Sequence, residues 1–359
     1  MRKDDHFEHG GGNGDPRLSG SIIVNPHTAA LDGVVTATYT GTEQGVSIQW
    51  CLNGEPVGTA ESGATSTLPT SGRAQGIYTV TASAPGFASL TSAPVFVLDT
   101  EGGFNFRRLG DVSVVMGADS PPAELSIPAT LGGLTVVAIW DFAFVGNQLT
   151  SVTIPAGVTV IGSGAFACNQ LTSVTIPAGV TVIEELAFWR NQLTSVAIPA
   201  GVIVIEGGAF AVNPDLASIA VAPGNQHFRS IDGVLYDRAG TTLLAWPAGK
   251  SPVNIPSGVT GIGNGAFSGN RLESVDILAG VTVIGSSAFA GNRLESVTIP
   301  AGVTGIGGSA FEDNEDTLQT VTIPFASVAA ADAAWGGEWR NGLPAAFNDP
   351  AYSGWRFAE

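Results

Sequence analysis

The chain has 359 residues, of which 44% are hydrophobic and 13% are charged, so it is able to bury a large core. Its 31 acidic and 14 basic residues give a formal net charge of −17, which argues against nucleic acid or an anionic membrane surface as a partner. No run approaches the roughly 18 apolar residues of a membrane-spanning helix, and the N-terminus MRKDDHFEHGGGNGD lacks the apolar stretch of an export signal, so we expect no membrane insertion by this chain.

The first two segments of the chain differ in composition. Residues 1–18 are polar and glycine-rich, which predicts a disordered tail. Residues 19–98 contain strand-like runs separated by Gly, Pro, Asn and Ser, which predicts a β-sandwich. Alternation within one of these runs predicts that Trp50 lies in the core. The runs are Ser21–Asn25, Val34–Tyr39, Val46–Leu52, Ile77–Ala84 and Ala93–Leu98.

This segment resembles the immunoglobulin-like domains of bacterial surface proteins, in which a core tryptophan and a Gly-x-Tyr-Thr-Val strand recur. Here these features are Trp50 and Gly76–Val80. The paired cysteines of antibody domains are missing, because Cys51 and Cys168 fall in different predicted domains. We therefore expect neither a disulfide nor a zinc site, and the resemblance implies a spacer or stalk.

In the second half of the chain, a cassette of the form LTSVTIPAGVTVIGxxAFxxN recurs, in most copies after 22 residues. A coil of this length cannot bury its apolar side alone, so successive coils must stack into a solenoid. We predict a linker and N-terminal cap over 99–148, repeats over 149–324 and a C-terminal cap over 325–359. The copies start at Leu149, Leu171, Leu193, Leu216, Lys250, Leu272, Leu294 and Leu318, and the aromatic residues of the second cap are Trp335, Trp339, Phe347, Trp355 and Phe357.

Each cassette position has an expected direction. The first, fourth and sixth residues of LTSVTIP, such as Leu171, Val174 and Ile176, are predicted to point into the coil. The third and fifth then face outward, and stacking aligns them in rows about 4.7–4.9 Å apart. The recurring Phe is predicted to form a buried aromatic spine, and the Asn three residues later to satisfy backbone groups of its turn.

The outward rows, which are small, polar and nearly uncharged, are the candidate binding surface. Glu273, Asp276 and Glu295 are expected to give the later coils an acidic edge that favours a basic partner. The candidate residues are Ser151, Thr153, Ser173, Thr175, Ser195, Ser274, Asp276, Ser296 and Thr298.

A second candidate lies in the longest repeat, 216–249, which carries an insertion at about 225–249. Its sequence is typical of a β-hairpin projecting from one edge of the stack, where Tyr236 and Trp246 would contact a ligand. The alternative is that both aromatic side chains pack onto the solenoid edge.

The cassette resembles the leucine-rich repeats of the BspA-like family of bacterial surface proteins, whose pattern is close to L-x-x-L-x-L-P-x-x-L-x-x-I-G-x-x-A-F-x-x-C. The likeness covers roughly residues 104–324, and Asp232–Tyr236 also resembles an insertion of that family. The resemblance implies an extracellular or cell-surface protein whose leader is removed or lies outside this chain. It implies adhesion to a protein or glycan of a host, including its matrix, or of a neighbouring cell.

The sequence predicts no catalytic centre, metal site or cofactor. The histidines are scattered and form no set with a nucleophile or a carboxylate, and the acidic run 312–316 lacks the spacing of a calcium loop. They are His6, His9, His27 and His227. We therefore expect no enzyme.

The predicted fold class is mainly β: an immunoglobulin-like β-sandwich followed by a capped right-handed leucine-rich-repeat solenoid, acting as a non-catalytic binding protein. One alternative is a structural spacer. Another is an ice-binding array, which requires uninterrupted rows of hydroxyl groups. The ice-binding alternative is disfavoured because the rows are interrupted at Ala197, Ala220, Asn254 and Asp276.

Overall fold

The structure is a computed structural model in which the chain divides into two units, residues 1–111 and 112–359. The predicted tail, together with His6, His9 and His27, lies outside the described residues. The described residues are 22–25, 28–30, 34–41, 44, 46–52, 55–63, 65–69, 76–85, 88–92, 95–314, 316–341 and 343–357.

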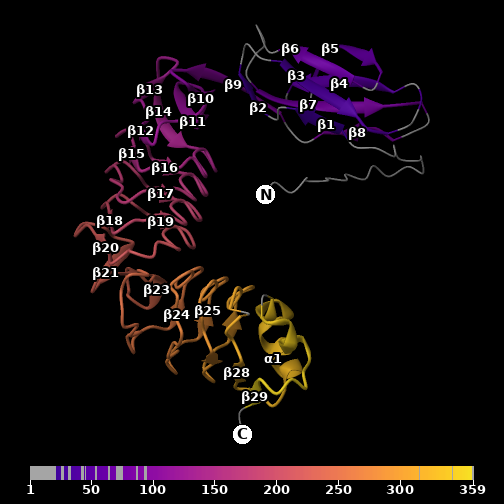
Figure 1. Ribbon diagram of the computed structural model, residues 1–359. Coiled ribbons are helices and arrows are strands. Elements are labelled where there is room, and N and C mark those ends of the chain that lie inside the picture. Colours follow the sequence, from indigo (N-terminus) through magenta and orange to yellow (C-terminus); the bar gives the residue numbers. More distant parts are fainter. Residues whose placement is uncertain are drawn as a thin grey trace. The chain divides into compact units, whose positions relative to one another are not determined.

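The first unit contains two β-sheets (Figure 1). One sheet has the order β1 (Ile22–Asn25), β3 (Val34–Tyr39) and β6 (Thr65–Pro69). The other runs β10 (Phe104–Leu109), β9 (Val95–Glu101), β7 (Gly76–Ser83), β4 (Ser47–Leu52) and β5 (Glu55–Ser62), with β2 (Thr28–Ala30) beside β9 and β8 (Leu90–Thr91) beside β7.

The two sheets share one core. Tyr39 from the first sheet clusters with Ile48 and Trp50 from the second, and all three side chains are buried. The indole nitrogen of Trp50 donates to the hydroxyl of Ser66 at 3.0 Å, which satisfies the polar atom of a ring that is only 5% exposed. The predicted burial of Trp50 is confirmed.

The first residues of the predicted linker and cap, 99–103, belong to a hairpin in the structure. Strand β9 continues through Glu101, and Gly102 and Gly103, with φ of +58° and +84°, turn the chain into β10. Asp99 is buried and accepts from the guanidinium of Arg108 at 2.6 Å, which ties the two strands together. The segment is polar because it is a hairpin, and the glycines provide its turn.

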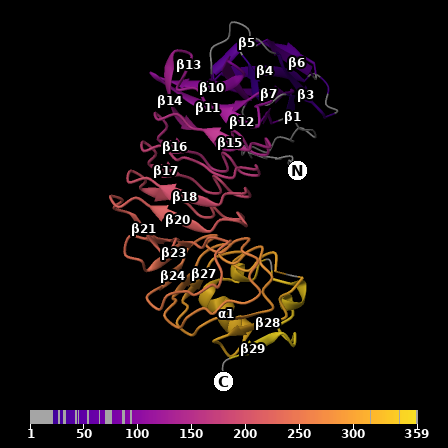
Figure 2. The ribbon, with the colours of Figure 1, turned by 60° about the vertical axis from the view of Figure 1, so that its left-hand side comes forward.

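The second unit consists of coils whose short strands form two columns (Figure 2). The first column is formed by the LTSVTIP segments and by one strand of the C-terminal cap. It contains β12 (Glu124–Ser126), β15 (Ser151–Thr153), β18 (Ser195–Ile198), β20 (Ser218–Val221), β26 (Ser296–Thr298), β28 (Thr320–Ile323) and, from the cap, β29 (Trp355–Phe357). The second contains β11 (Val112–Ala118), β14 (Leu134–Ile139), β16 (Val160–Ile161), β17 (Val182–Ile183), β19 (Val204–Ile205), β23 (Thr242–Ala245), β24 (Gly261–Ile262), β25 (Val283–Ile284) and β27 (Gly305–Ile306). Three further strands are β13 (Thr130–Leu131), which pairs with β14, and the hairpin β21 (Phe228–Ile231) and β22 (Val234–Asp237).

The predicted aromatic spine is confirmed. The rings form two stacks, one on each side of the insertion, and within each stack consecutive rings are buried and close to parallel, with centroids 5.1–5.7 Å apart. In the coil with the insertion, Trp246 occupies the Phe position and stacks on Phe267. The spine residues are Phe144, Phe166, Phe188 and Phe210, then Trp246, Phe267, Phe289 and Phe311.

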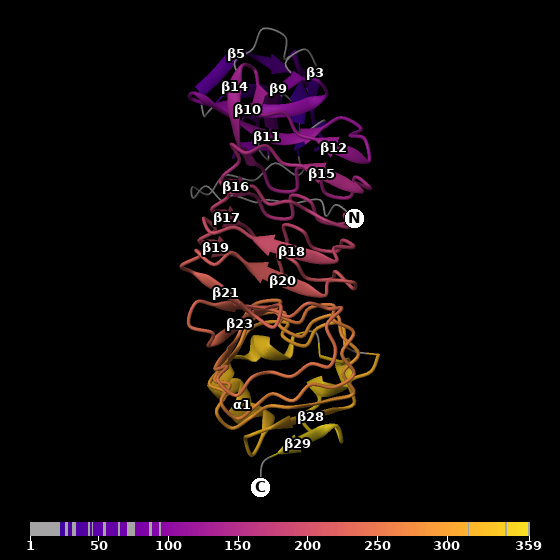
Figure 3. The ribbon, with the colours of Figure 1, turned by 90° about the vertical axis from the view of Figure 1, so that its left-hand side faces the viewer.

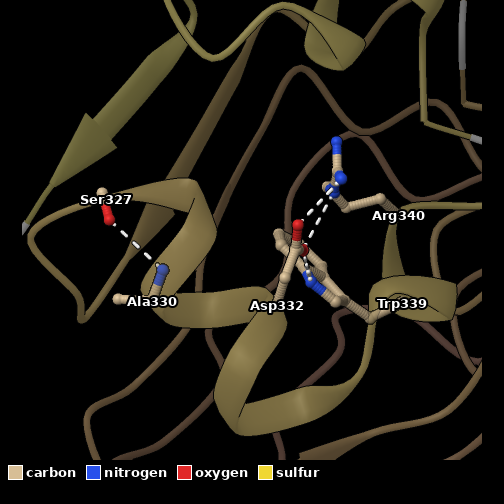
Figure 4. A network of polar contacts seen from close by, with 5 residues as sticks. All are labelled: Ser327, Ala330, Asp332, Trp339 and Arg340. Atoms are coloured by element: carbon tan, nitrogen blue, oxygen red, sulfur yellow. Dashed lines mark hydrogen bonds and ion pairs between the residues drawn. The ribbon is translucent and has the colours of Figure 1, made fainter.

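The C-terminal residues pack over the last coil through α1 (Val328–Trp335) and two 3-10 turns, Gly337–Arg340 and Ala345–Asn348. The side chain of Ser327 caps α1 by accepting from the Ala330 amide, and the carboxylate of Asp332 accepts from Trp339 and Arg340 (Figure 4). The predicted aromatic residues are buried at Trp335, Trp339, Phe347 and Trp355.

Phe357 departs from that prediction, because its side chain is 39% exposed. It is the last described residue of β29, which pairs only with β28, so within the described chain no further strand follows to shield the ring.

Candidate functional site

The first column presents its third and fifth cassette positions to solvent. The burial pattern of β18 alternates, with Ser195 and Ala197 exposed and Val196 and Ile198 buried. Parallel pairing places Ser195 beside Ser218, so equivalent side chains of neighbouring coils form rows. Figure 3 shows the strands of this column one below another.

All nine outward residues predicted from the cassette are exposed, and we call them the Ser/Thr face. Ser173 and Thr175 belong to a coil whose first segment is not an assigned strand, yet both are exposed. At the C-terminal end of the column the rows continue as Thr320 and Thr322, which are half-buried. The face comprises Ser151, Thr153, Ser173, Thr175, Ser195, Ser274, Asp276, Ser296 and Thr298.

The later coils do not form the purely acidic edge that was expected. Glu273 and Glu295 are exposed, but so are Arg271 and Arg293, each two residues earlier in the same cassette. With Asp276 also exposed, the edge carries three carboxylates and two guanidinium groups, so its expected acidic character is largely balanced.

The insertion does not project as a contact surface. Tyr236 is 1% exposed and Trp246 is 5% exposed, so neither ring is available to a ligand. The indole nitrogen of Trp246 donates to the carbonyl of Lys250 at 3.0 Å. Burial, and then the charge of Asp232, raises the pKa of Tyr236 to about 12. The alternative interpretation, that both side chains pack into the solenoid, is the one the structure shows.

A pair of carboxylates that the sequence did not indicate lies in the turns after the second column. The amide of Ser163 donates to Asp141 Oδ1 and to Glu184 Oε2, both at 3.0 Å, although the three residues come from three coils. Burial, and then the charge of Asp141, raises the pKa of Glu184. Asp141 and Glu184 belong to coils on either side of the coil of Ser163, so only the stacking register brings the two carboxylates to the same amide.

We expect Glu184→Gln to stabilise the protein at about pH 7 relative to the wild type. The folded-state pKa of Glu184 is raised, so ionisation of this carboxyl costs stability, and the cost appears as the pH rises through that pKa. At about pH 3.5, below the ordinary glutamate pKa of about 4.3, the advantage of the variant disappears. Thermal unfolding at both pH values measures the difference.

The matched control is Glu273→Gln, which removes an exposed carboxylate from the other column. A variant at Glu184 that is less stable than the wild type at about pH 7, or equally stabilised at both pH values, would contradict the assignment.

The titratable side chains of the described residues do not gather into a metal site. No group of three His, Cys, Asp or Glu side chains among them is arranged to hold a metal ion. His227, the one histidine within the described ranges, lies against the ring of Phe228. Within the same ranges, no helix has the length and apolar character needed to cross a membrane.

The model of the family described as 'BspA type Leucine rich repeat region' matches this chain in six copies. The matches cover residues 129–231 and 250–333, which is more than half of the chain. A leucine-rich repeat protein from Eubacterium ventriosum is similar at 24% identity over 63% of this chain and 73% of that chain, with a TM-score of 0.48. A leucine rich cell surface protein from Faecalibacterium prausnitzii is similar at 21% identity over 73% and 95%, with a TM-score of 0.43. The pneumococcal vaccine antigen PcpA is similar at 18% identity over 64% of this chain and 82% of that chain, with a TM-score of 0.45. Comparison with curated proteins finds no significant match. The chain belongs to the BspA-type leucine-rich repeat family.

Proposed function

We propose that this protein is a non-catalytic binding protein, secreted or on the cell surface, that adheres to a protein or glycan through the Ser/Thr face. The observation that carries the proposal is the regular exposure of small hydroxyl side chains on the first column. Each hydroxyl donates one hydrogen bond and accepts others, so rows of hydroxyls suit the amide groups of a protein or the hydroxyl groups of a glycan. Their small size lets a ligand approach the strands closely.

The secreted or surface location follows from the family resemblance and is part of the proposal. So is the immunoglobulin-like character of the first unit, which we propose serves as a spacer between the solenoid and its attachment. Its two packed sheets and the buried Trp50 agree with that role.

We expect the double variant Ser173→Lys, Thr175→Lys to weaken ligand binding at least about tenfold, which corresponds to about 1.4 kcal/mol. Both side chains are exposed on the coil between those of Ser151 and Ser195, and two lysines there would hold a flat ligand away from the neighbouring coils. The measurement is surface plasmon resonance of the full chain against matrix proteins and uncharged glycans.

The matched control is Thr159→Lys, Thr282→Lys, which adds the same charges beside the second column, where both threonines are exposed. Equal loss of binding in both double variants would contradict the assignment to the first column. A wild-type protein that binds nothing on the panel would favour the spacer alternative.

A further inference from the structure

The insertion breaks the hydrogen-bonded ladder of the second column. In the regular coils, Thr181 O accepts from the amide of Ile203, and Ile183 O accepts from the amide of Glu206. One coil later, no described residue donates to the equivalent carbonyls of Ile203 and Ile205, and β19 pairs only with β17. Strand β19 therefore ends its sheet with an open edge.

Asp237 explains why the ladder stops there. In the coil before the insertion, the amides of Ile203 and Val204 both donate to Thr181 O. Thr241 and Thr242 occupy the equivalent positions in the insertion coil. In the insertion coil, both amides donate to the carboxylate of Asp237, at 2.8 and 3.0 Å. Burial alone raises the pKa of Asp237, but hydrogen bonds from Thr242, Thr241 and Gly240 outweigh it and lower that pKa. The ionised carboxylate thus replaces the Ile203 carbonyl as the acceptor.

A cavity of about 450 Å³ lies next to this edge. The insertion coil reaches its spine residue, Trp246, three residues after Leu243, whereas the previous coil takes five residues from Ile205 to Phe210. Because the insertion coil is shorter here, the turn of the coil before it contacts the turn of the coil after it. The amide of Gly208 donates to the carbonyl of Asn264 at 3.2 Å.

The cavity combines an apolar lining with acidic groups. Ile205, Phe210 and Leu244 supply apolar surface, and Glu185 and Glu206 supply carboxylates. Both glutamates are exposed, so the cavity is accessible from solvent, and neither forms an ion pair with a basic side chain within the described part of the chain. Its volume lies in the range of ligand pockets, roughly 300–1,000 Å³.

We propose that this edge and cavity form a binding site for an extended peptide segment of a partner protein, with an Arg or Lys side chain of that segment seated in the cavity. The peptide amides donate to the carbonyls of Ile203 and Ile205, as an added strand does. Ile203 and Val204, which are 48% and 37% exposed, give it apolar contact. The two carboxylates have no ion-pair partner among the described residues, although Glu206 Oε2 also accepts from the Glu185 amide at 3.2 Å, and together with a net charge of −17 they select a cationic side chain.

The site is separate from the Ser/Thr face, because β19 belongs to the second column.

The proposal is tested by selecting binders of the full chain from a displayed library of random heptapeptides. The affinity of the best peptide is then measured by calorimetry. We expect the selected sequences to share a basic residue flanked by β-branched residues. Glu185→Gln, Glu206→Gln should weaken the peptide at least tenfold, and so should N-methylation of the peptide backbone.

The matched control is Glu273→Gln, Glu295→Gln, which removes two exposed carboxylates from the other column and should leave the affinity unchanged. The double variant Ser173→Lys, Thr175→Lys should also keep the peptide affinity, even if it loses adhesion. The proposal is overturned if no peptide is enriched, if enriched peptides lack a basic residue, or if the two glutamine variants of the cavity bind as the wild type does. A dimer of this chain that Ile203→Arg dissociates would also overturn it, since the edge would then hold a second copy.

Discussion

Replacing Phe166 by alanine should lower the free energy of unfolding of the repeat unit by about 3–5 kcal/mol. The ring is fully buried and stacks on Phe144 at 5.6 Å and on Phe188 at 5.5 Å, so its removal leaves a hole shared by three coils. The neighbouring backbones are fixed by inter-coil hydrogen bonds, such as Phe166 N to Ala187 O at 2.9 Å, which limits collapse around the hole. Calorimetry of the full chain measures the loss as a lower unfolding temperature of the repeat unit.

Phe142→Ala is the matched control, because it removes the same ring from a side chain that is 58% exposed in a neighbouring turn. We expect it to cost less than about 1 kcal/mol, as is usual for surface positions. A similar loss at both positions would mean that the spine contributes no more than any other aromatic contact.

The spine and the Ser/Thr face could be predicted because both depend on local periodicity. A residue such as Leu171 repeats at a fixed spacing, and once the coils stack, that spacing alone assigns its side chain to the core. Alternation then assigns Ser173 and Thr175 to the surface. Neither inference needs knowledge of contacts that are distant in the sequence.

Two parts of the first unit could not be predicted in this way. Strands β5 and β6, at Glu55–Ser62 and Thr65–Pro69, contain mostly Ser, Thr, Glu and Gly, so they show no apolar alternation. They form strands because β4 and β3 offer them hydrogen-bonding edges. The segment after Asp99 has the composition of a linker for the same reason, since its partner strand is what makes it a hairpin.

The insertion shows a different limit. Trp246 could not be assigned to the spine, because the insertion coil is shorter between its strand and its ring than the other coils are. The open edge of β19 was equally hidden, because it depends on Asp237 accepting two amides that would otherwise pair across coils. Arg271 and Arg293, by contrast, lie at a fixed cassette position two residues before Glu273 and Glu295, so the sequence itself carries the signal that this edge is mixed in charge.

Replacing Asn191 by alanine should lower the free energy of unfolding by about 2–4 kcal/mol, because the loss combines an orphaned amide with a broken buried network. The side chain is 3% exposed. Its Oδ1 accepts from the amide of Leu171 at 3.1 Å, and its Nδ2 donates to the carbonyls of Phe166, Phe188 and Trp189 at 2.9–3.3 Å. Urea denaturation followed by tryptophan fluorescence measures the change.

The network also decides which of these contacts matters most. Phe166 O keeps a second donor in Asn169, and Phe188 O keeps one in Asn213, whereas the Leu171 amide has Asn191 as its acceptor. Asn147→Ala is therefore the informative control, because that asparagine begins the row and makes one contact, to Val145 O at 3.3 Å, so its loss should cost less than about 1 kcal/mol.

Asn191→Asp retains an acceptor for Leu171 but turns a carboxylate toward carbonyl oxygens. We expect it to be less stable at about pH 7 than at about pH 4, where protonation restores a donor. If the Asn191→Asp variant were as stable as the wild type at both pH values, the hydrogen bonds of the asparagine row would not contribute to stability.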